Sequence, residues 1–95
     1  MARIKVTYYG LIKTVVDKQE EEYQVSSETT VKQLLQSLID TYGDKFRLKI
    51  FTPEMQILPL VVIQVDGRDI DGLDVKLKDN SELSITVIPH PVMGG

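Results

Sequence analysis

Apolar and polar residues alternate with the period of a β-strand in several segments of the chain. Residues 3–9 show this first, because Ile4, Val6 and Tyr8 fall on one face and polar side chains dominate the other. Residues 20–25 alternate in the same way after a polar stretch. The two segments therefore predict an antiparallel hairpin of half-buried strands with a longish loop.

The spacing of the apolar residues changes to that of a helix after residue 30. Thr30 is suited to be the N-cap and Gln33 stands three residues later, so the pair predicts a capping box. Gly43 is a natural stop for the helix. The helix is therefore expected over residues 31–42, with one apolar stripe made of Val31, Leu34, Leu35, Leu38, Ile39 and Tyr42.

The second half of the chain predicts further strands. Residues 46–50 alternate apolar and basic side chains, which indicates a short strand with a basic outer face. The nearly continuous apolar run of residues 60–65 is typical of a central strand. The Asp-Gly pair at residues 66–67 predicts a tight turn, so residues 68–70 are expected to pair back briefly. Residues 83–87 alternate again as a final strand.

This order of elements predicts an α+β domain, in which a mixed sheet of four to five strands packs on one main helix. A small sheet needs such a helix to bury its apolar face. The β-grasp fold satisfies the order, although periodicity alone also allows other one-helix α+β topologies. A chain of 95 residues suits one domain. We expect residues 1–88 to form it and residues 89–95 to form an extended tail.

Composition narrows the range of functions. Eleven basic and fourteen acidic residues give a net charge of −3, and no two basic residues are adjacent, which argues against nucleic acid as the main partner. The absence of cysteine excludes disulfides, thiolate metal sites and a thiol nucleophile in this chain. No apolar stretch reaches the length of a membrane span, and the first residues do not resemble a signal peptide. A cytoplasmic domain without a metal site is the expectation.

Catalytic signatures are missing from the sequence. It contains no phosphate-binding, dinucleotide-binding, zinc-protease or nucleophile-elbow motif. Acidic residues are dense near the end of the chain, but their spacing does not follow the EF-hand pattern. We interpret them as solvated turn residues, with an acidic docking edge as the alternative: Asp66, Asp69, Asp71, Asp74, Asp79 and Glu82.

The C-terminal segment has a different character. From residue 83 onward the sequence contains no Asp, Glu, Lys or Arg, and His90 is the only titratable side chain. Pro89 and Pro91 favour extended conformations in the residues before them. Gly94 and Gly95 lack a Cβ, so a narrow channel could admit their backbone. Residues from Pro89 onward could reach about 23 Å when extended. A frayed chain end is the alternative interpretation.

The sequence as a whole resembles the MoaD/ThiS family of ubiquitin-like sulfur carriers. The last residues match the family's Gly-Gly ending, and residues 46–60 look like the extra hairpin of its longer, molybdopterin synthase small subunit type. His90 and Met93 depart from the usual tail. The other similar segments are the opening strand at residues 4–9, the helix entry at 30–35, the turn at 65–70 and the run into the last strand at 77–83.

The resemblance implies a β-grasp fold and a carrier that is not itself an enzyme. A ubiquitin-activating-enzyme-like adenylyltransferase would join Gly95 to AMP, using ATP and magnesium that the partner binds. A persulfide sulfur donor would then convert Gly95 to a thiocarboxylate. The most favoured destination of the sulfur is molybdopterin, in molybdenum or tungsten cofactor biosynthesis, with a large molybdopterin synthase subunit as partner. No cofactor or metal bound by this chain is implied.

Partner binding is expected at two places. Gly94 and the preceding Pro91, Val92 and Met93 would enter the partner with Gly95. By alternation, an apolar docking patch on the sheet face opposite the core would contain Tyr9, Val62 and Ile88. The alternative is that these three are ordinary exposed residues or are covered by the extra hairpin.

Other functions remain open at this point. A protein modifier would use the same activated Gly95 to form an isopeptide bond with a substrate lysine. A sulfur carrier could also serve tRNA thiolation, thiamine synthesis or cysteine synthesis. A plain interaction module, in which the terminal glycines are incidental, is a third class.

Overall fold

The structure is a computed structural model that describes residues 1–89. A five-stranded mixed sheet has the strand order β2-β1-β5-β3-β4. In chain order the elements are β1 (Ala2–Gly10), α1 (Lys13–Val16), β2 (Glu20–Val25), α2 (Val31–Tyr42), α3 (Asp44–Ile50), β3 (Val61–Val65), β4 (Arg68–Asp69) and β5 (Glu82–Val87).

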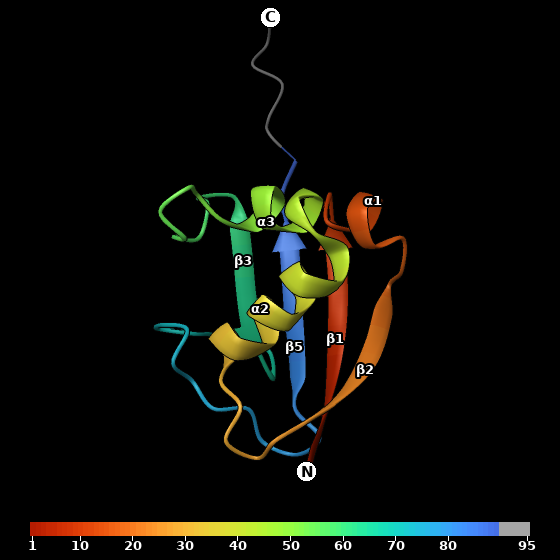
Figure 1. Ribbon diagram of the computed structural model, residues 1–95, viewed down its shortest axis with the longest axis vertical. Helices are drawn as coiled ribbons and strands as arrows, with labels where there is room; N and C mark the ends of the chain where they lie inside the picture. The colour runs from red at the N-terminus through yellow and green to blue at the C-terminus, as the bar shows by residue number, and fades with distance from the viewer. Residues whose placement is uncertain (90–95) are drawn as a thin grey trace, which may run out of the picture.

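The first and last strands lie side by side in the middle of the sheet. β1 is antiparallel to β2 and parallel to β5, while β3 is antiparallel to both β5 and β4. Helix α2 crosses one face of the sheet, and α1 and α3 lie at the end toward which β5 points (Figure 1). This arrangement is the β-grasp fold, so the predicted α+β class, the initial hairpin and the single main helix are confirmed.

The core lies between α2 and the facing side of the sheet. Strand alternation sends every second side chain of β1 and β5 toward the helix, and those side chains are almost completely buried. Burying one such aliphatic side chain contributes about 1.5–3 kcal/mol. The residues that meet in this layer are Ile4, Val6 and Tyr8 of β1, Leu83, Ile85 and Val87 of β5, and Val31, Leu34, Leu35 and Leu38 of α2.

Helix α2 begins with the predicted capping box. The backbone N–H of Gln33 donates to the Thr30 hydroxyl over 3.2 Å, and the Gln33 side-chain oxygen accepts from the Thr30 N–H over 3.0 Å. These bonds satisfy two backbone donors that the first turn would otherwise leave exposed. At the other end, Gly43 takes a φ of +82° and its N–H donates to the Ile39 carbonyl. Both predicted helix ends are therefore confirmed.

The predicted strand at residues 46–50 is wrong, because this segment is helix α3. Phe46 and Ile50 are fully buried, whereas Leu48 is 59% exposed. The buried pair has the i, i+4 spacing of a helix face, and the segment is too short for the alternation to exclude that spacing. Asp44 accepts from Arg47 one turn later and adds a local helix contact.

The expected extra hairpin is reduced to a single antiparallel bridge between Phe51 and Ile57. Pro53 and a turn at Met55, whose φ is +64°, occupy the segment between them. β3 is not the central strand, since β5 holds the middle and β4 pairs only with the last two residues of β3. The short helix α1 was not predicted from the sequence.

A half-buried carboxylate joins three elements at the β2 side of the molecule. Glu21 of β2 accepts hydrogen bonds from the hydroxyls of Tyr8 in β1 and Tyr42 in α2, and from Lys18 at 3.2 Å. Burial acts to raise the pKa of Glu21, but these three hydrogen bonds together outweigh it, so the pKa lies below its ordinary value. Burial, assisted by Glu21, raises the pKa of Tyr42 to about 12. Glu21 thus ties the edge strand and the helix end to β1.

We expect Glu21→Gln to lower the free energy of unfolding by about 1–2 kcal/mol at pH 7, because charge-assisted hydrogen bonds are lost from a partly buried site. Urea unfolding followed by circular dichroism measures this. Since the folded pKa of Glu21 is depressed, its contribution is fully present above the ordinary value of 4.5 and disappears as the pH falls through the folded pKa. The difference between wild type and Glu21→Gln should therefore shrink below pH 4.5.

Glu22→Gln is the matched control. Its side chain is 63% exposed and reaches Arg3 only at 3.9 Å, so its loss should change stability by less than about 0.5 kcal/mol. Equal effects of the two variants would contradict the assigned role of Glu21.

Candidate functional site

The end of β5 is held in place from both sides. On one side the backbone N–H of Leu11, just after β1, donates to the Val87 carbonyl over 2.9 Å. On the other side the Ile88 N–H donates to the Leu60 carbonyl over 2.8 Å. The next residue is Pro89, which has no N–H and cannot extend the ladder. The sheet therefore fixes the point at which the chain leaves β5, beside the end of β1 and the start of β3 (Figure 1).

Gly10 makes this close packing possible. Its φ is +73°, and a Cβ built on it would lie 2.2 Å from the Val87 carbonyl oxygen. A side chain at this position would therefore collide with the backbone that anchors the chain end. The absence of a Cβ is required both by the left-handed backbone and by the approach to β5.

An apolar row crosses the sheet face that α2 leaves uncovered. In the strand registers, Tyr9 of β1 and Val62 of β3 are both paired with Thr86 of β5. Ile88 follows Thr86 by two residues, and alternation places its side chain on the same face. Tyr9 is 46% exposed and Ile88 is 43% exposed. We call Tyr9, Val62, Thr86 and Ile88 the open-face row.

The far end of the same face carries charges. Lys5 pairs with Glu20 at 3.3 Å, and Arg3 approaches Glu22 at 3.9 Å. Hydrogen bonding and charge attraction by Glu20, followed by the charge of Glu82, raise the pKa of Lys5 above its ordinary value. The open face is therefore apolar next to the chain exit and charged away from it, a division that suits a docking surface with an apolar centre and a polar rim.

The structure brings three of the predicted partner-binding residues to one place: Tyr9, Val62 and Ile88. Sequence reasoning missed Thr86, which sits between Tyr9 and Val62, because strand order is not encoded in any local pattern. It also missed Gly10, whose only signal was a glycine at the end of an alternating segment. The remaining predicted site residues lie outside the described residues, namely Pro91, Val92, Met93, Gly94 and Gly95.

Within residues 1–89, no group of three or more His, Asp or Glu side chains is arranged to hold a metal ion. In the same part of the chain, no helix combines the length and the apolar character that crossing a membrane requires.

The fold and the hydrogen bonds that hold the end of β5 define a ubiquitin-like β-grasp domain. A sequence model of the ThiS family matches residues 6–95. The chain belongs to the ThiS family of ubiquitin-like sulfur carriers. No curated protein matches the sequence.

Solved structures share the fold over almost the whole chain. Small archaeal modifier protein 1 of H. volcanii superimposes with a TM-score of 0.82 at 13% identity, covering 94% of this chain and 100% of its own. The BexX/CysO complex of Amycolatopsis orientalis matches with a TM-score of 0.69 at 21% identity, covering 97% and 99%. A complex of subunits 1 and 2 of molybdopterin-converting factor from Helicobacter pylori gives a TM-score of 0.57 at 22% identity, covering 98% and 99%.

We expect Gly10→Ala to lower the free energy of unfolding by about 3 kcal/mol or more, since it adds a backbone clash to the roughly 1–2 kcal/mol cost of a left-handed alanine. Thermal unfolding followed by circular dichroism measures the loss. Gly67→Ala is the matched control, because Gly67 has a φ of +81° but open space around its Cβ. A loss at Gly10 no larger than that at Gly67 would contradict the proposed steric role.

Proposed function

We propose that this chain is a sulfur carrier whose C-terminal Gly95 is adenylated and then converted to a thiocarboxylate. Membership of the ThiS family, with a match that reaches residue 95, is the observation that carries the proposal. The anchored end of β5 supports it, because residues 1–89 form a rigid base from which the following residues can be presented to a partner.

The chemistry begins with activation, since a carboxylate is a poor electrophile. A ubiquitin-activating-enzyme-like adenylyltransferase joins the Gly95 carboxylate to the AMP part of ATP, with magnesium, and releases pyrophosphate. The terminal sulfur of a persulfide donor attacks the acyl carbon and displaces AMP. A thiol then cleaves the resulting acyl disulfide, which leaves the thiocarboxylate on Gly95 and a disulfide on the thiol side. Every catalytic group in this series of reactions belongs to a partner, so the carrier acts as a substrate and is not an enzyme.

In this proposal the tail inserts into the partner and the open-face row docks on its surface. Gly94 and Gly95 enter the partner's nucleotide site, while Pro91, Val92 and Met93 occupy the channel of the partner that leads to it. Tyr9, Val62 and Ile88 dock on the partner surface around the entrance. The position of the open-face row beside the chain exit supports this division, because one partner can contact both.

For the destination of the sulfur we propose molybdopterin, with a large molybdopterin synthase subunit as the second partner. The fold similarity to a converting-factor complex agrees with this choice. Because activation consumes ATP, we place the carrier in the cytoplasm.

A protein modifier is the second candidate, favoured by the similarity to a small archaeal modifier protein. In that case activated Gly95 forms an isopeptide bond with a substrate lysine. Immunoblots of cell lysate against the carrier separate the two functions: a ladder of conjugates indicates the modifier, and a single free band indicates the carrier. Carriers for tRNA thiolation, thiamine or cysteine synthesis form the same thiocarboxylate and differ only in the acceptor.

The proposal predicts that Gly95 tolerates no change. Gly95→Ala, or one residue added after Gly95, should abolish activation while the free energy of unfolding stays within about 0.5 kcal/mol, since changes at the last residue of a chain are in general close to neutral for stability. Intact mass spectrometry is applied after incubation with the activating enzyme, ATP, magnesium and a sulfur donor. The wild type should show one oxygen replaced by sulfur, and neither variant should.

A wild type that forms neither the adenylate nor the thiocarboxylate with its cognate activating enzyme overturns the carrier proposal. Truncation of Gly94 and Gly95 without any effect in vivo would instead indicate a plain interaction module.

The docking role of the open-face row is tested separately. The double variant Tyr9→Gln and Ile88→Gln should weaken binding to the activating enzyme at least tenfold, about 1.4 kcal/mol, because buried aromatic and aliphatic anchors dominate interface energies. Isothermal titration calorimetry measures the dissociation constant, and circular dichroism verifies the fold. Val75→Gln is the control, since Val75 is 36% exposed and its carbonyl accepts from Val31 at the start of α2, away from the row. Unchanged affinity in the double variant removes the docking role.

A further inference from the structure

The outward face of helix α3 is not used by the proposed function. Phe46 and Ile50 of this helix are fully buried, whereas Leu48 is 59% exposed on the opposite side. The helical spacing places Lys45 one turn before both Leu48 and Lys49, and both lysines are exposed. We call Lys45, Leu48 and Lys49 the α3 patch.

The two lysines of the α3 patch have no compensating charge within the described residues. The third basic residue of the helix, Arg47, is paired with Asp44 at 3.3 Å. Neither Lys45 nor Lys49 forms an ion pair within residues 1–89. Like charges at i and i+4 repel each other on a helix. The α3 patch therefore combines an exposed apolar side chain with two cations whose repulsion an acidic partner would relieve.

Backbone hydrogen bonds connect α3 to the point at which the chain leaves β5. The Ile50 carbonyl at the end of α3 accepts from the Leu58 N–H over 2.9 Å, and the Leu60 carbonyl accepts from the Ile88 N–H over 2.8 Å. Residues 58–60 thus join the helix end to the end of β5. Helix α3 lies at the end of the sheet toward which β5 points (Figure 1). A partner that takes up the C-terminal segment therefore approaches α3 as well as the open-face row.

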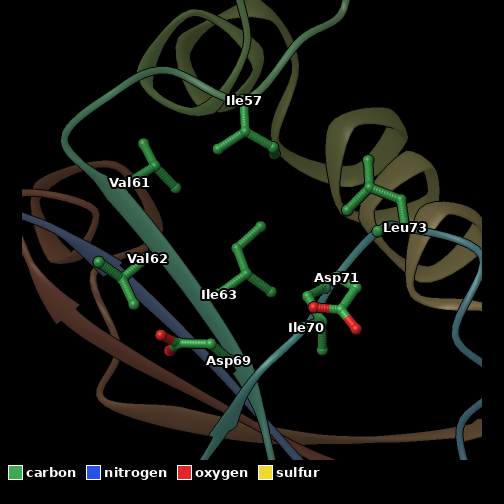
Figure 2. Close-up of a pocket in the computed structure, with 9 residues that line it drawn as sticks. Ile57, Val61, Val62, Ile63, Asp69, Ile70, Asp71 and Leu73 are labelled. Carbon is green, nitrogen blue, oxygen red and sulfur yellow. The ribbon is translucent and has the colours of Figure 1, made fainter.

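The opposite charge lies beyond β3. A pocket of about 360 Å³ there is lined by aliphatic side chains and by the carboxylates of Asp69 and Asp71 (Figure 2). Both carboxylates are exposed, and neither forms an ion pair within residues 1–89. Val62 of the open-face row is also one of the lining residues, so this acidic side adjoins the row. The surroundings of the open-face row are therefore acidic near β4 and basic at α3.

We propose that the α3 patch binds an acidic surface of the activating enzyme, beside the entrance that takes up the C-terminal segment. This inference rests on the proposed function and specifies the partner's chemistry: carboxylates that face Lys45 and Lys49, next to an apolar spot that receives Leu48.

Charge also sets the direction of approach. The chain as a whole carries a net charge of −3, so an acidic partner is repelled by most orientations and attracted by the side that presents the α3 patch. An anionic membrane is disfavoured as the occupant, since a single leucine offers little apolar area for insertion.

The test measures binding of the full chain to its cognate activating enzyme by isothermal titration calorimetry, with the fold verified by circular dichroism. At about 50 mM NaCl, the double variant Lys45→Glu and Lys49→Glu should raise the dissociation constant at least tenfold, and Leu48→Gln at least threefold. At about 500 mM NaCl the effect of the charge reversal should shrink, because salt screens exposed charges, whereas the effect of Leu48→Gln should persist.

The charge-matched control is the double variant Lys32→Glu and Lys78→Glu. Both lysines are exposed, form no ion pair within residues 1–89, and lie at the start of α2 and before β5, away from the chain exit. This variant has the same net charge as the reversed α3 patch and should change the dissociation constant less than threefold. Equal effects of the two double variants would overturn the proposal.

Neutralising the acidic side separates the two charged regions. Asp69→Asn with Asp71→Asn should leave the affinity unchanged or increase it, because an acidic partner gains nothing from these carboxylates. A loss of threefold or more would place the docking contact at the β3 pocket and overturn the proposal. Lysine-dependent binding to vesicles containing 30% phosphatidylserine, with unchanged affinity for the enzyme, would assign the α3 patch to a membrane instead.

Intact mass spectrometry of the wild type in the same preparations distinguishes the two proposals. If the thiocarboxylate forms while the α3 variants bind as tightly as the wild type, only the inference about the α3 patch fails. If the wild type neither binds the enzyme nor gains sulfur, both proposals fail.

Discussion

The parallel pairing of β1 with β5 is the constraint on which the rest of the structure depends. Parallel neighbours cannot be joined by a tight turn, so every other element lies in the connection between them. The pairing buries the alternating side chains of both strands under α2. It also directs β1 and β5 to the same end of the sheet, where Gly10 meets Val87. The position of the chain exit is therefore a consequence of how the core is built.

The same pairing gives the two sheet faces different properties. The helix-facing side is filled by aliphatic residues and closed by the Glu21 hydrogen bonds. The open side carries the apolar row near the ends of β1 and β5, and ion pairs of Arg3 and Lys5 toward the beginning of β1. The backbone bonds from Leu11 to Val87 and from Ile88 to Leu60 hold the end of the middle strand beside this apolar row, so the row and the chain exit lie next to each other.

Short-range sequence patterns correctly predicted the structural features that depend only on residues close together in the sequence. The capping box at Thr30, the stripe of α2 and the Asp66-Gly67 turn all depend on neighbours within a few residues, so they could be read from the sequence. The seven-residue helix at Asp44–Ile50 could not, because the apolar positions of residues 46–50 fit either a strand or a helix, and only the burial of Phe46 and Ile50 decides between them. Tyr9 and Val62 were assigned to one face by alternation, but their common neighbour Thr86 follows only from strand order. The pairing of Glu21 with Tyr8 and Tyr42 depends on tertiary contacts in the same way.

The two edges of the sheet illustrate how such non-local geometry sets possible interactions. At β2 the outward backbone groups belong to residues whose acidic side chains are paired with Arg3 and Lys5, and charged edges of this kind resist strand addition. At the opposite edge β4 pairs with the last two residues of β3, and the same register places Ile70 directly across from Ile63, so the chain itself covers part of this edge.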